Sequence, residues 1–152
     1  MNRYFVEMLQ ELFAAGADFI VVGAYAMAAH ERPRATGDID IWVRPTTRNA
    51  ERVWLALVSF GAPLHDLQLE DLSKPGITFQ MGLPPNRIDI LTEITGVTFD
   101  EAWENRLMIE RGELRYAVIG KADLIRNKRA TARPKDLLDV ENLLDVENLE
   151  RQ

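Results

Sequence analysis

Two stretches of the chain carry apolar residues at the three- and four-residue spacing of an amphipathic helix. The first covers residues 5–13 and the second residues 50–58, and each is followed by a glycine, Gly16 and Gly61. Glycine is favoured directly after a helix because it adopts the left-handed conformation without strain. The pattern therefore predicts two helices that each bury one face and end at a glycine.

Between these helices the pattern becomes that of short strands. Residues 18–22 form an apolar run typical of a strand, and Gly23 then interrupts the chain. The alanine-rich residues 24–30 follow, and they favour a helix. A second strand over 38–43 comes before the next helix. Helices and strands alternate, which predicts an α/β fold.

The strand over 38–43 alternates acidic and apolar side chains in the order Asp-Ile-Asp-Ile-Trp-Val. Side chains two residues apart share one face of a strand, so Asp38 and Asp40 project together. Trp42 shares that face, and we expect it to pack at the sheet. The other face is apolar and consists of Ile39, Ile41 and Val43. The sequence thus predicts two neighbouring carboxylates on a half-buried strand.

Prolines divide the middle of the chain into short pieces. Residues 77–81 and 87–91 are typical of strands, and the Pro-Pro-Asn sequence at 84–86 is typical of a turn, so we expect a hairpin. The remaining predicted elements are a helix over 99–106, a strand over 114–119 and helical structure from about residue 121, with Pro134 at the start of the last helix.

Composition indicates one globular domain. The chain has 152 residues, of which 47% are apolar and 28% are charged, enough to build a single core. We expect one domain over 1–152, with a core over 1–119 and a C-terminal helical segment over 120–152.

The lack of cysteine excludes disulfides, thiol nucleophiles and cysteine-based zinc sites, and it suits a reducing compartment. We find neither a signal peptide nor an apolar run long enough to cross a membrane, so we expect a cytoplasmic protein without membrane contact. The net charge of −6 disfavours unspecific binding to nucleic acid. Residues 121–135 nevertheless form a local basic patch, and an acidic segment over 136–150 follows it.

A third candidate carboxylate is Asp89, which lies between two isoleucines in the same pattern as Asp38 and Asp40. If its strand lies beside theirs, three acids meet at one edge of the sheet. Hard oxygen ligands suit Mg²⁺ better than a transition metal. Three carboxylates can hold two such ions about 3.5–4 Å apart, an arrangement that serves phosphoryl or nucleotidyl transfer. The turn at Gly23 and Ala24 can supply backbone N–H groups to a phosphate.

These motifs occur in an informative order. Val-Val-Gly-Ala at 21–24 is followed by a helix, then by Arg-Pro-Arg-Ala-Thr-Gly-Asp-Ile-Asp-Ile at 32–41, and later by Arg-Ile-Asp-Ile-Leu at 87–91. This order resembles the DNA polymerase β-like nucleotidyltransferase superfamily. Within it, the chain is most similar to minimal bacterial members related to the AbiEii toxins of toxin–antitoxin systems. That branch also carries a late helical motif, which here corresponds to Lys128, Arg133, Lys135, Asp136 and Asp139.

The resemblance implies a nucleotidyltransferase-like fold, a mixed and twisted sheet with helices packed on one face and a C-terminal helical segment. It also implies Mg²⁺-dependent transfer of a nucleoside monophosphate from a nucleoside triphosphate to an acceptor hydroxyl, with two ions expected. Asp38, Asp40 and Asp89 would be the catalytic and metal-binding residues. The nucleotide-binding residues would be Gly23, Ala24, Lys128 and Lys135. The residues touching acceptor or phosphate would be Arg32, Arg34 and Arg133.

Several alternatives stay open at this stage. Relatives usually have Gly-Gly or Gly-Ser where this chain has Gly23 and Ala24. This departure favours a second interpretation, a noncatalytic interaction or antitoxin-like module with the same fold. A metal-dependent phosphodiesterase would usually need histidine ligands. The acceptor can be an RNA such as tRNA, a protein or a small molecule, and a toxin would have an antitoxin partner. We also expect Asp136 and Asp139 to pair with Arg133 and Lys135 instead of binding metal.

Overall fold

The structure is a computed structural model that describes residues 1–30 and 36–150, with side chains described up to residue 145. Its elements, in chain order, are α1 (Arg3–Ala14), β1 (Phe19–Val22), α2 (Gly23–Ala29), β2 (Asp38–Val43), α3 (Thr47–Phe60), the 3-10 helix η1 (Leu69–Ser73), β3 (Thr78–Met81), β4 (Arg87–Leu91), α4 (Phe99–Glu104), β5 (Leu107–Arg111), β6 (Leu114–Val118), α5 (Lys121–Thr131) and α6 (Pro134–Glu150). The predicted alternation of helices and strands is confirmed.

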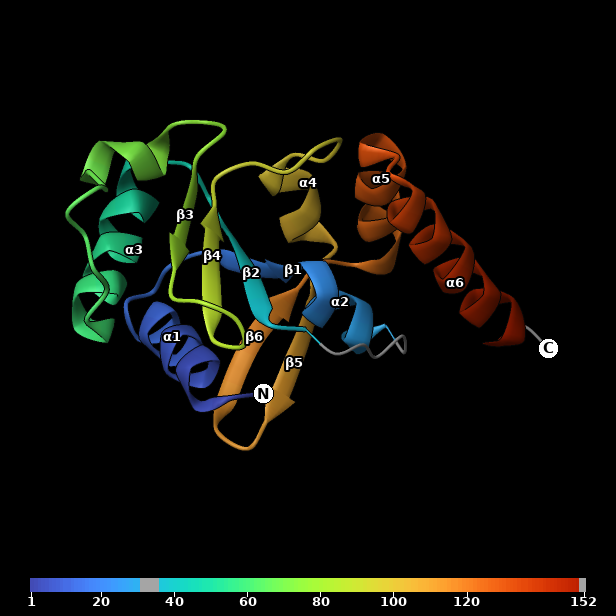
Figure 1. Ribbon diagram of the computed structural model, residues 1–152, viewed down its shortest axis with the longest axis horizontal. Helices are drawn as coiled ribbons and strands as arrows, with labels where there is room; N and C mark the ends of the chain where they lie inside the picture. Colours follow the sequence, from blue (N-terminus) through green and yellow to red (C-terminus); the bar gives the residue numbers. More distant parts are fainter. Residues whose placement is uncertain (31–35, 151–152) are drawn as a thin grey trace.

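All six strands belong to one mixed sheet with the order β3-β4-β2-β1-β6-β5 (Figure 1). The pairs β2 with β4 and β1 with β6 are parallel, and the other three pairs are antiparallel. The expected hairpin is present as β3 and β4. β2 and β1 therefore lie in the middle of the sheet, where neighbours on both sides hold their side chains in place.

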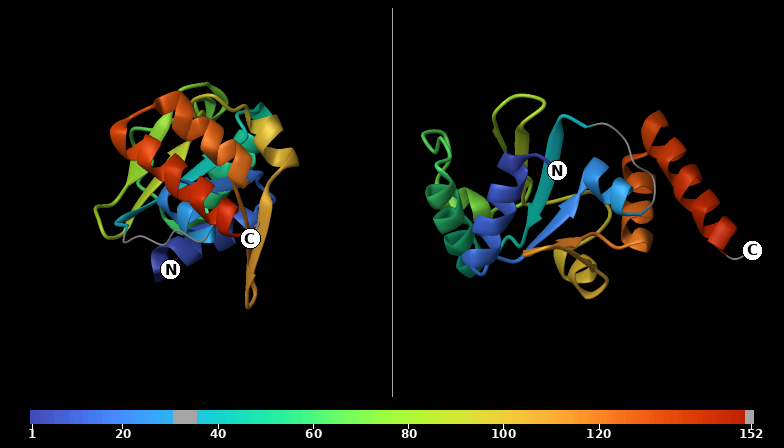
Figure 2. Two further views of the ribbon diagram at one scale, coloured as in Figure 1. Left: turned by 90° about the vertical axis from the view of Figure 1, so that its right-hand side faces the viewer. Right: turned by 90° about the horizontal axis from the view of Figure 1, so that it is seen from below.

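The two faces of β2 differ as the alternation predicts. Ile39, Ile41 and Val43 are fully buried in the core, and Trp42 on the acid face is also buried, packed edge-to-face against Phe99 of α4. α4 therefore covers the acid face beyond the carboxylates. α1 and α3 pack on each other, and α3 lies at the opposite end of the molecule from α5 and α6 (Figures 1 and 2).

Local signals in the sequence explain where α3 begins and ends. The hydroxyl of Thr46 accepts a hydrogen bond from the backbone N–H of Asn49, which caps the first turn. Gly61 ends the helix with a φ of +88°, a conformation that an L residue adopts only with strain. The chain thus turns sharply at both ends of α3, which places this helix against α1.

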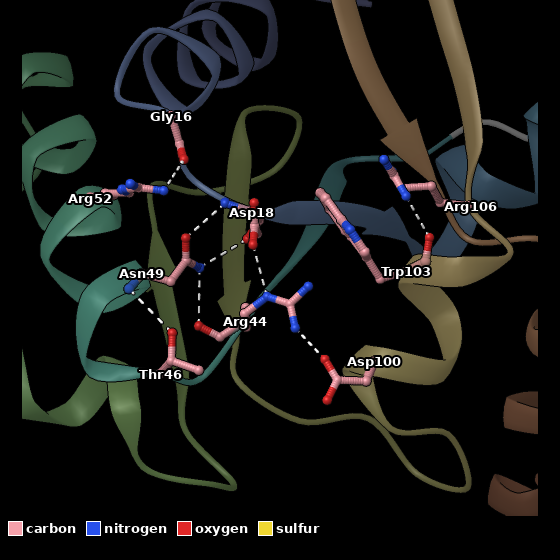
Figure 3. Close-up of polar contacts among 9 residues, drawn as sticks. All are labelled: Gly16, Asp18, Arg44, Thr46, Asn49, Arg52, Asp100, Trp103 and Arg106. Carbon is pink, nitrogen blue, oxygen red and sulfur yellow. Dashed lines mark hydrogen bonds and ion pairs between the residues drawn. The ribbon is translucent and has the colours of Figure 1, made fainter.

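A buried polar cluster holds the end of β1 and β2 that lies away from the carboxylates (Figure 3). The Asn49 side chain, only 3% exposed, accepts from the backbone N–H of Asp18 at 2.7 Å and donates to the carbonyls of Asp18 and Arg44, each at 3.0 Å. Arg44 forms ion pairs with Asp18 and Asp100, and its guanidinium lies over the ring of Phe99. These contacts join β1, β2, α3 and α4.

The helices described within residues 1–30 and 36–150 include none with both the length and the apolar character needed to cross a membrane.

Candidate functional site

The pairing of β2 with β4 brings the three predicted carboxylates together. In the parallel register, Asp40 lies opposite Asp89 and Asp38 lies opposite Arg87. One carboxylate oxygen from each of Asp38, Asp40 and Asp89 lies within 4.8 Å of the others. The three acids were expected to meet only if their two strands were neighbours, and in the fold these strands are neighbours. Among the residues that the structure describes, this is the one group of three or more such side chains with metal-binding spacing.

The three carboxylates differ in burial and in partners. Asp89 is 4% exposed, and its Oδ1 atom accepts no hydrogen bond from the described residues, although the charged Arg87 side chain lies 3.2 Å away. Asp38 and Asp40 are partly exposed. The hydroxyl of Thr36 donates to Oδ1 of Asp38 at 2.9 Å, which fixes that carboxylate beside the strand. A buried carboxylate oxygen without a donor is unfavourable unless a cation or a ligand satisfies it.

Crowding of the carboxylates changes the proton affinity of Asp40. Burial is the main cause, and the charge of Asp38 and a hydrogen bond with Asp89 act in the same direction. Together they raise the pKa of Asp40 from 3.8 to about 7, although the positive charge of Arg87 opposes them. Asp40 is therefore partly protonated near neutral pH. A cation at this site would displace the proton, because positive charge favours the ionised carboxylate.

Arg87 is a member of the site that the sequence analysis did not identify. Its Nη2 atom donates to Oδ2 of Asp38 at 2.7 Å and to Oδ2 of Asp89 at 3.2 Å, and its Nε atom lies 3.2 Å from Oδ1 of Asp89. The last pair lacks hydrogen-bond alignment. The signal was available, because Arg87 lies two residues before Asp89 and so shares its face of the strand.

Gly23 leaves β1 directly beside Asp40. Its φ is +71°, and a Cβ atom placed on it would lie 2.2 Å from Oδ2 of Asp40. Only glycine allows the backbone to approach the carboxylate this closely. Ala24 follows at the start of α2 and is partly exposed. The predicted phosphate turn and the carboxylates are therefore adjacent.

Two of the predicted cations of the C-terminal segment, Lys128 and Arg133, belong to a cluster of ion pairs with buried acids. Lys128 of α5 is 7% exposed, and its Nζ atom lies 3.5 Å from Asp136 and 3.1 Å from Asp139, both on α6. Arg133 donates to Asp136 at 2.6 Å, as expected. We expected Lys135 to pair with one of these acids. Lys135 is exposed instead, and Lys128 forms the ion pair. The cluster ties α6 to α5.

The pKa of Asp136 reflects this cluster. Burial acts to raise it, but hydrogen bonds from Arg133 and Thr131 and the charge of Lys128 outweigh burial and hold it well below its usual range. The carboxylate is therefore charged and has its hydrogen-bond donors supplied within the chain. Arg32 and Arg34, the other predicted contacts of phosphate or acceptor, lie outside the described residues.

The donor set at Asp38, Asp40 and Asp89 fits a hard divalent cation. All three side chains offer oxygen, the preferred ligand of Mg²⁺, and the buried Oδ1 atom of Asp89 has no hydrogen bond to lose on binding. The described contacts of these carboxylates include no histidine, the usual ligand in zinc sites. The arrangement can therefore hold a divalent cation next to the turn at Gly23.

Comparison with known proteins supports the fold. No model of a known protein family matches the chain, and no curated protein matches it. Among solved structures, the chain is similar to a protein from Thermotoga maritima described as a "putative nucleotidyltransferase". The two share 13% sequence identity with a TM-score of 0.59, over 98% of this chain and 89% of that chain. This likeness does not single out the branch related to AbiEii toxins, which stays a prediction. The chain has a nucleotidyltransferase-like fold.

Proposed function

We propose that the protein is a Mg²⁺-dependent nucleotidyltransferase that moves a nucleoside monophosphate from a nucleoside triphosphate to an acceptor hydroxyl. One observation carries the proposal, namely that Asp38, Asp40 and Asp89 converge within 4.8 Å beside the turn at Gly23. A purely structural role would not require Asp40 beside the two carboxylates that Arg87 contacts, because its burial and the neighbouring negative charge are unfavourable for it. The nucleotidyltransferase-like fold adds support.

The carboxylates would hold the metal, with two ions expected once nucleotide is bound. Asp38 and Asp40, which project from the same face of β2, would be ligands, and Asp40 would give up its proton on binding. Mg²⁺, when bound, would stabilise negative charge that develops on the attacking and leaving oxygens. Asp89 would help to hold the second ion and would orient the acceptor hydroxyl, because its Oδ1 atom lies in the site and accepts no hydrogen bond from the described residues.

The turn would receive the triphosphate. Gly23 keeps the backbone next to Asp40, so N–H groups of Gly23 and Ala24 would contact phosphates of the nucleotide that the carboxylates hold through metal. Of the predicted C-terminal cations, Lys135 is exposed and available to a polyanion, whereas Lys128 and Arg133 are engaged with Asp136. Lys128 would have to leave its buried partners to reach a nucleotide.

The biological role that we propose is that of the toxin in a toxin–antitoxin pair, with an antitoxin as partner. The acceptor would then be an RNA such as tRNA, or a protein. The proposal rests on the sequence resemblance to the AbiEii-related branch and on the basic patch over 121–135. We further propose that residues 1–152 act as a single cytoplasmic domain.

Label transfer tests the proposed activity. The protein is incubated with Mg²⁺, a cell extract and each α-labelled nucleoside triphosphate in turn, and RNA, protein and small metabolites are separated. We expect label in one of these fractions with wild-type protein and none with Asp40→Asn, while Asp66→Asn, an exposed aspartate, serves as the matched control. Absence of transfer and of Mg²⁺-dependent nucleotide binding at millimolar nucleotide would leave the noncatalytic module as the better interpretation.

A further inference from the structure

The carboxylate site already contains a cation that belongs to the chain. Arg87 lies opposite Asp38 in the register of β2 with β4, and its guanidinium contacts Oδ2 of Asp38 at 2.7 Å and both oxygens of Asp89 at 3.2 Å. A guanidinium stays charged at every pH the fold tolerates. One positive charge from within the sheet is therefore shared by two of the three carboxylates and offsets part of their negative charge.

A divalent cation would be held by the same carboxylates that Arg87 contacts. Asp38 and Asp89 would have to serve both cations, and Oδ2 of Asp38 already accepts the shorter of the Arg87 hydrogen bonds. Two cations in this space would repel each other. The side chain of Arg87 is 32% exposed, so its guanidinium can move toward solvent without opening the core.

We propose that Arg87 is an internal counter-ion of the carboxylate site that competes with the divalent cation. It compensates Asp38 and Asp89 when metal is absent, and it gives up Asp38 when a metal ion binds. The inference rests on the proposed function, because the competition matters only if the site takes metal. As a consequence, a metal ion should bind weakly when no nucleotide is present. When a nucleotide arrives, its phosphates offer Arg87 another anion to pair with.

Isothermal titration of nucleotide-free protein with Mn²⁺ tests the competition. We expect Arg87→Met to bind Mn²⁺ about five-fold more tightly than wild type, as loss of one partly exposed charge pair allows. Arg115→Met is the matched control, because Arg115 pairs with Glu110 on the β5–β6 hairpin, and its Mn²⁺ affinity should equal that of wild type. Asp89→Asn should reduce binding, which assigns the heat to the carboxylates.

Thermal melting gives an independent readout. In chelator, Arg87→Met should melt below wild type because Asp38 and Asp89 lose their counter-ion, and saturating Mn²⁺ should reduce the difference. Arg87→Lys, with one donor centre in place of the planar fork, should be intermediate in both assays and serves if Arg87→Met does not fold. Equal or weaker Mn²⁺ binding by the Arg87 variants overturns the inference and leaves nucleotide transfer untouched. If the Arg87 variants bind Mn²⁺ more tightly but the wild-type protein transfers no label, only the proposed function is overturned.

Discussion

Gly23→Ala is the substitution that most directly probes the contact between the phosphate turn and the carboxylates. Two effects add at this position. The φ of +71° strains any L residue, at roughly 1–2 kcal/mol for the left-handed conformation. The new Cβ atom would also lie 2.2 Å from Oδ2 of Asp40, whereas real contacts essentially never fall below 3.0 Å. The Asp40 carboxylate must therefore retreat by at least about 0.8 Å, the difference between these distances.

Gly16→Ala separates the two effects. Gly16 has a φ of +72° but open space within 4 Å of the Cβ position, so the variant carries the strain without the clash. For a chain of this length we expect the strain to lower the melting temperature by about 2–8 °C in both variants. Only Gly23→Ala should also lose activity, by about 100-fold, because displacing a reacting group by about 1 Å has effects of this size.

The assays are thermal melting, Mn²⁺ titration and α-label transfer on the two variants and wild type. Gly23→Ala should fall well below Gly16→Ala in metal affinity and in transfer. If the two variants match each other within two-fold, roughly the uncertainty of such comparisons, then Gly23 does not support Asp40 and the phosphate turn is wrongly placed.

Three further predictions concern charge and buried polar groups. Because burial and neighbouring carboxylates raise the pKa of Asp40 from 3.8 to about 7, the folded chain keeps a proton that the unfolded chain releases, so stability should fall as pH rises between these values. Asp40→Asn should flatten that decline in urea unfolding measured over this range, and an unchanged slope would show that Asp40 ionises normally. Lys128→Met leaves the buried Asp136 and Asp139 without their lysine and should lower the free energy of unfolding by about 3 kcal/mol in the same assay. Lys135→Met, at an exposed position, should change it by less than about 0.5 kcal/mol. Equal effects of the two variants would contradict the buried cluster. Asn49→Ala removes three hydrogen bonds far from the carboxylates and leaves the backbone N–H of Asp18 without its acceptor, while the carbonyls of Asp18 and Arg44 keep their backbone donors. The variant should cost about 1–3 kcal/mol with transfer retained below the melting temperature, so selective loss of transfer would tie this cluster to the reaction.

Structural features that depend only on residues close together in the chain could be predicted from the sequence. The alternation over 38–43 predicted which face of β2 carries Asp38 and Asp40, and the glycine after α3 predicted where that helix ends. Periodicity decides such features because each follows from backbone geometry over a few residues. The pairing of β4 with β2 could only be assumed, since sheet order depends on how distant segments meet.

Features whose signals are weak or non-local could not be predicted from the sequence. β5 was not predicted, and its residues lie at the edge of the sheet, largely exposed, where no buried face imposes alternation. η1 is a short 3-10 helix whose five residues are too few for a periodic pattern. Lys128 was expected at the nucleotide, and its burial between Asp136 and Asp139 depends on how α6 packs on α5, which no local pattern shows.

The most direct test of the central claim is an anomalous difference map from crystals grown with Mn²⁺ and a non-hydrolysable nucleoside triphosphate. The account predicts manganese peaks between the carboxylates of Asp38, Asp40 and Asp89, with the phosphates against the turn at Gly23. Nucleotide bound elsewhere, or manganese absent from these three side chains at saturating concentration, would contradict it.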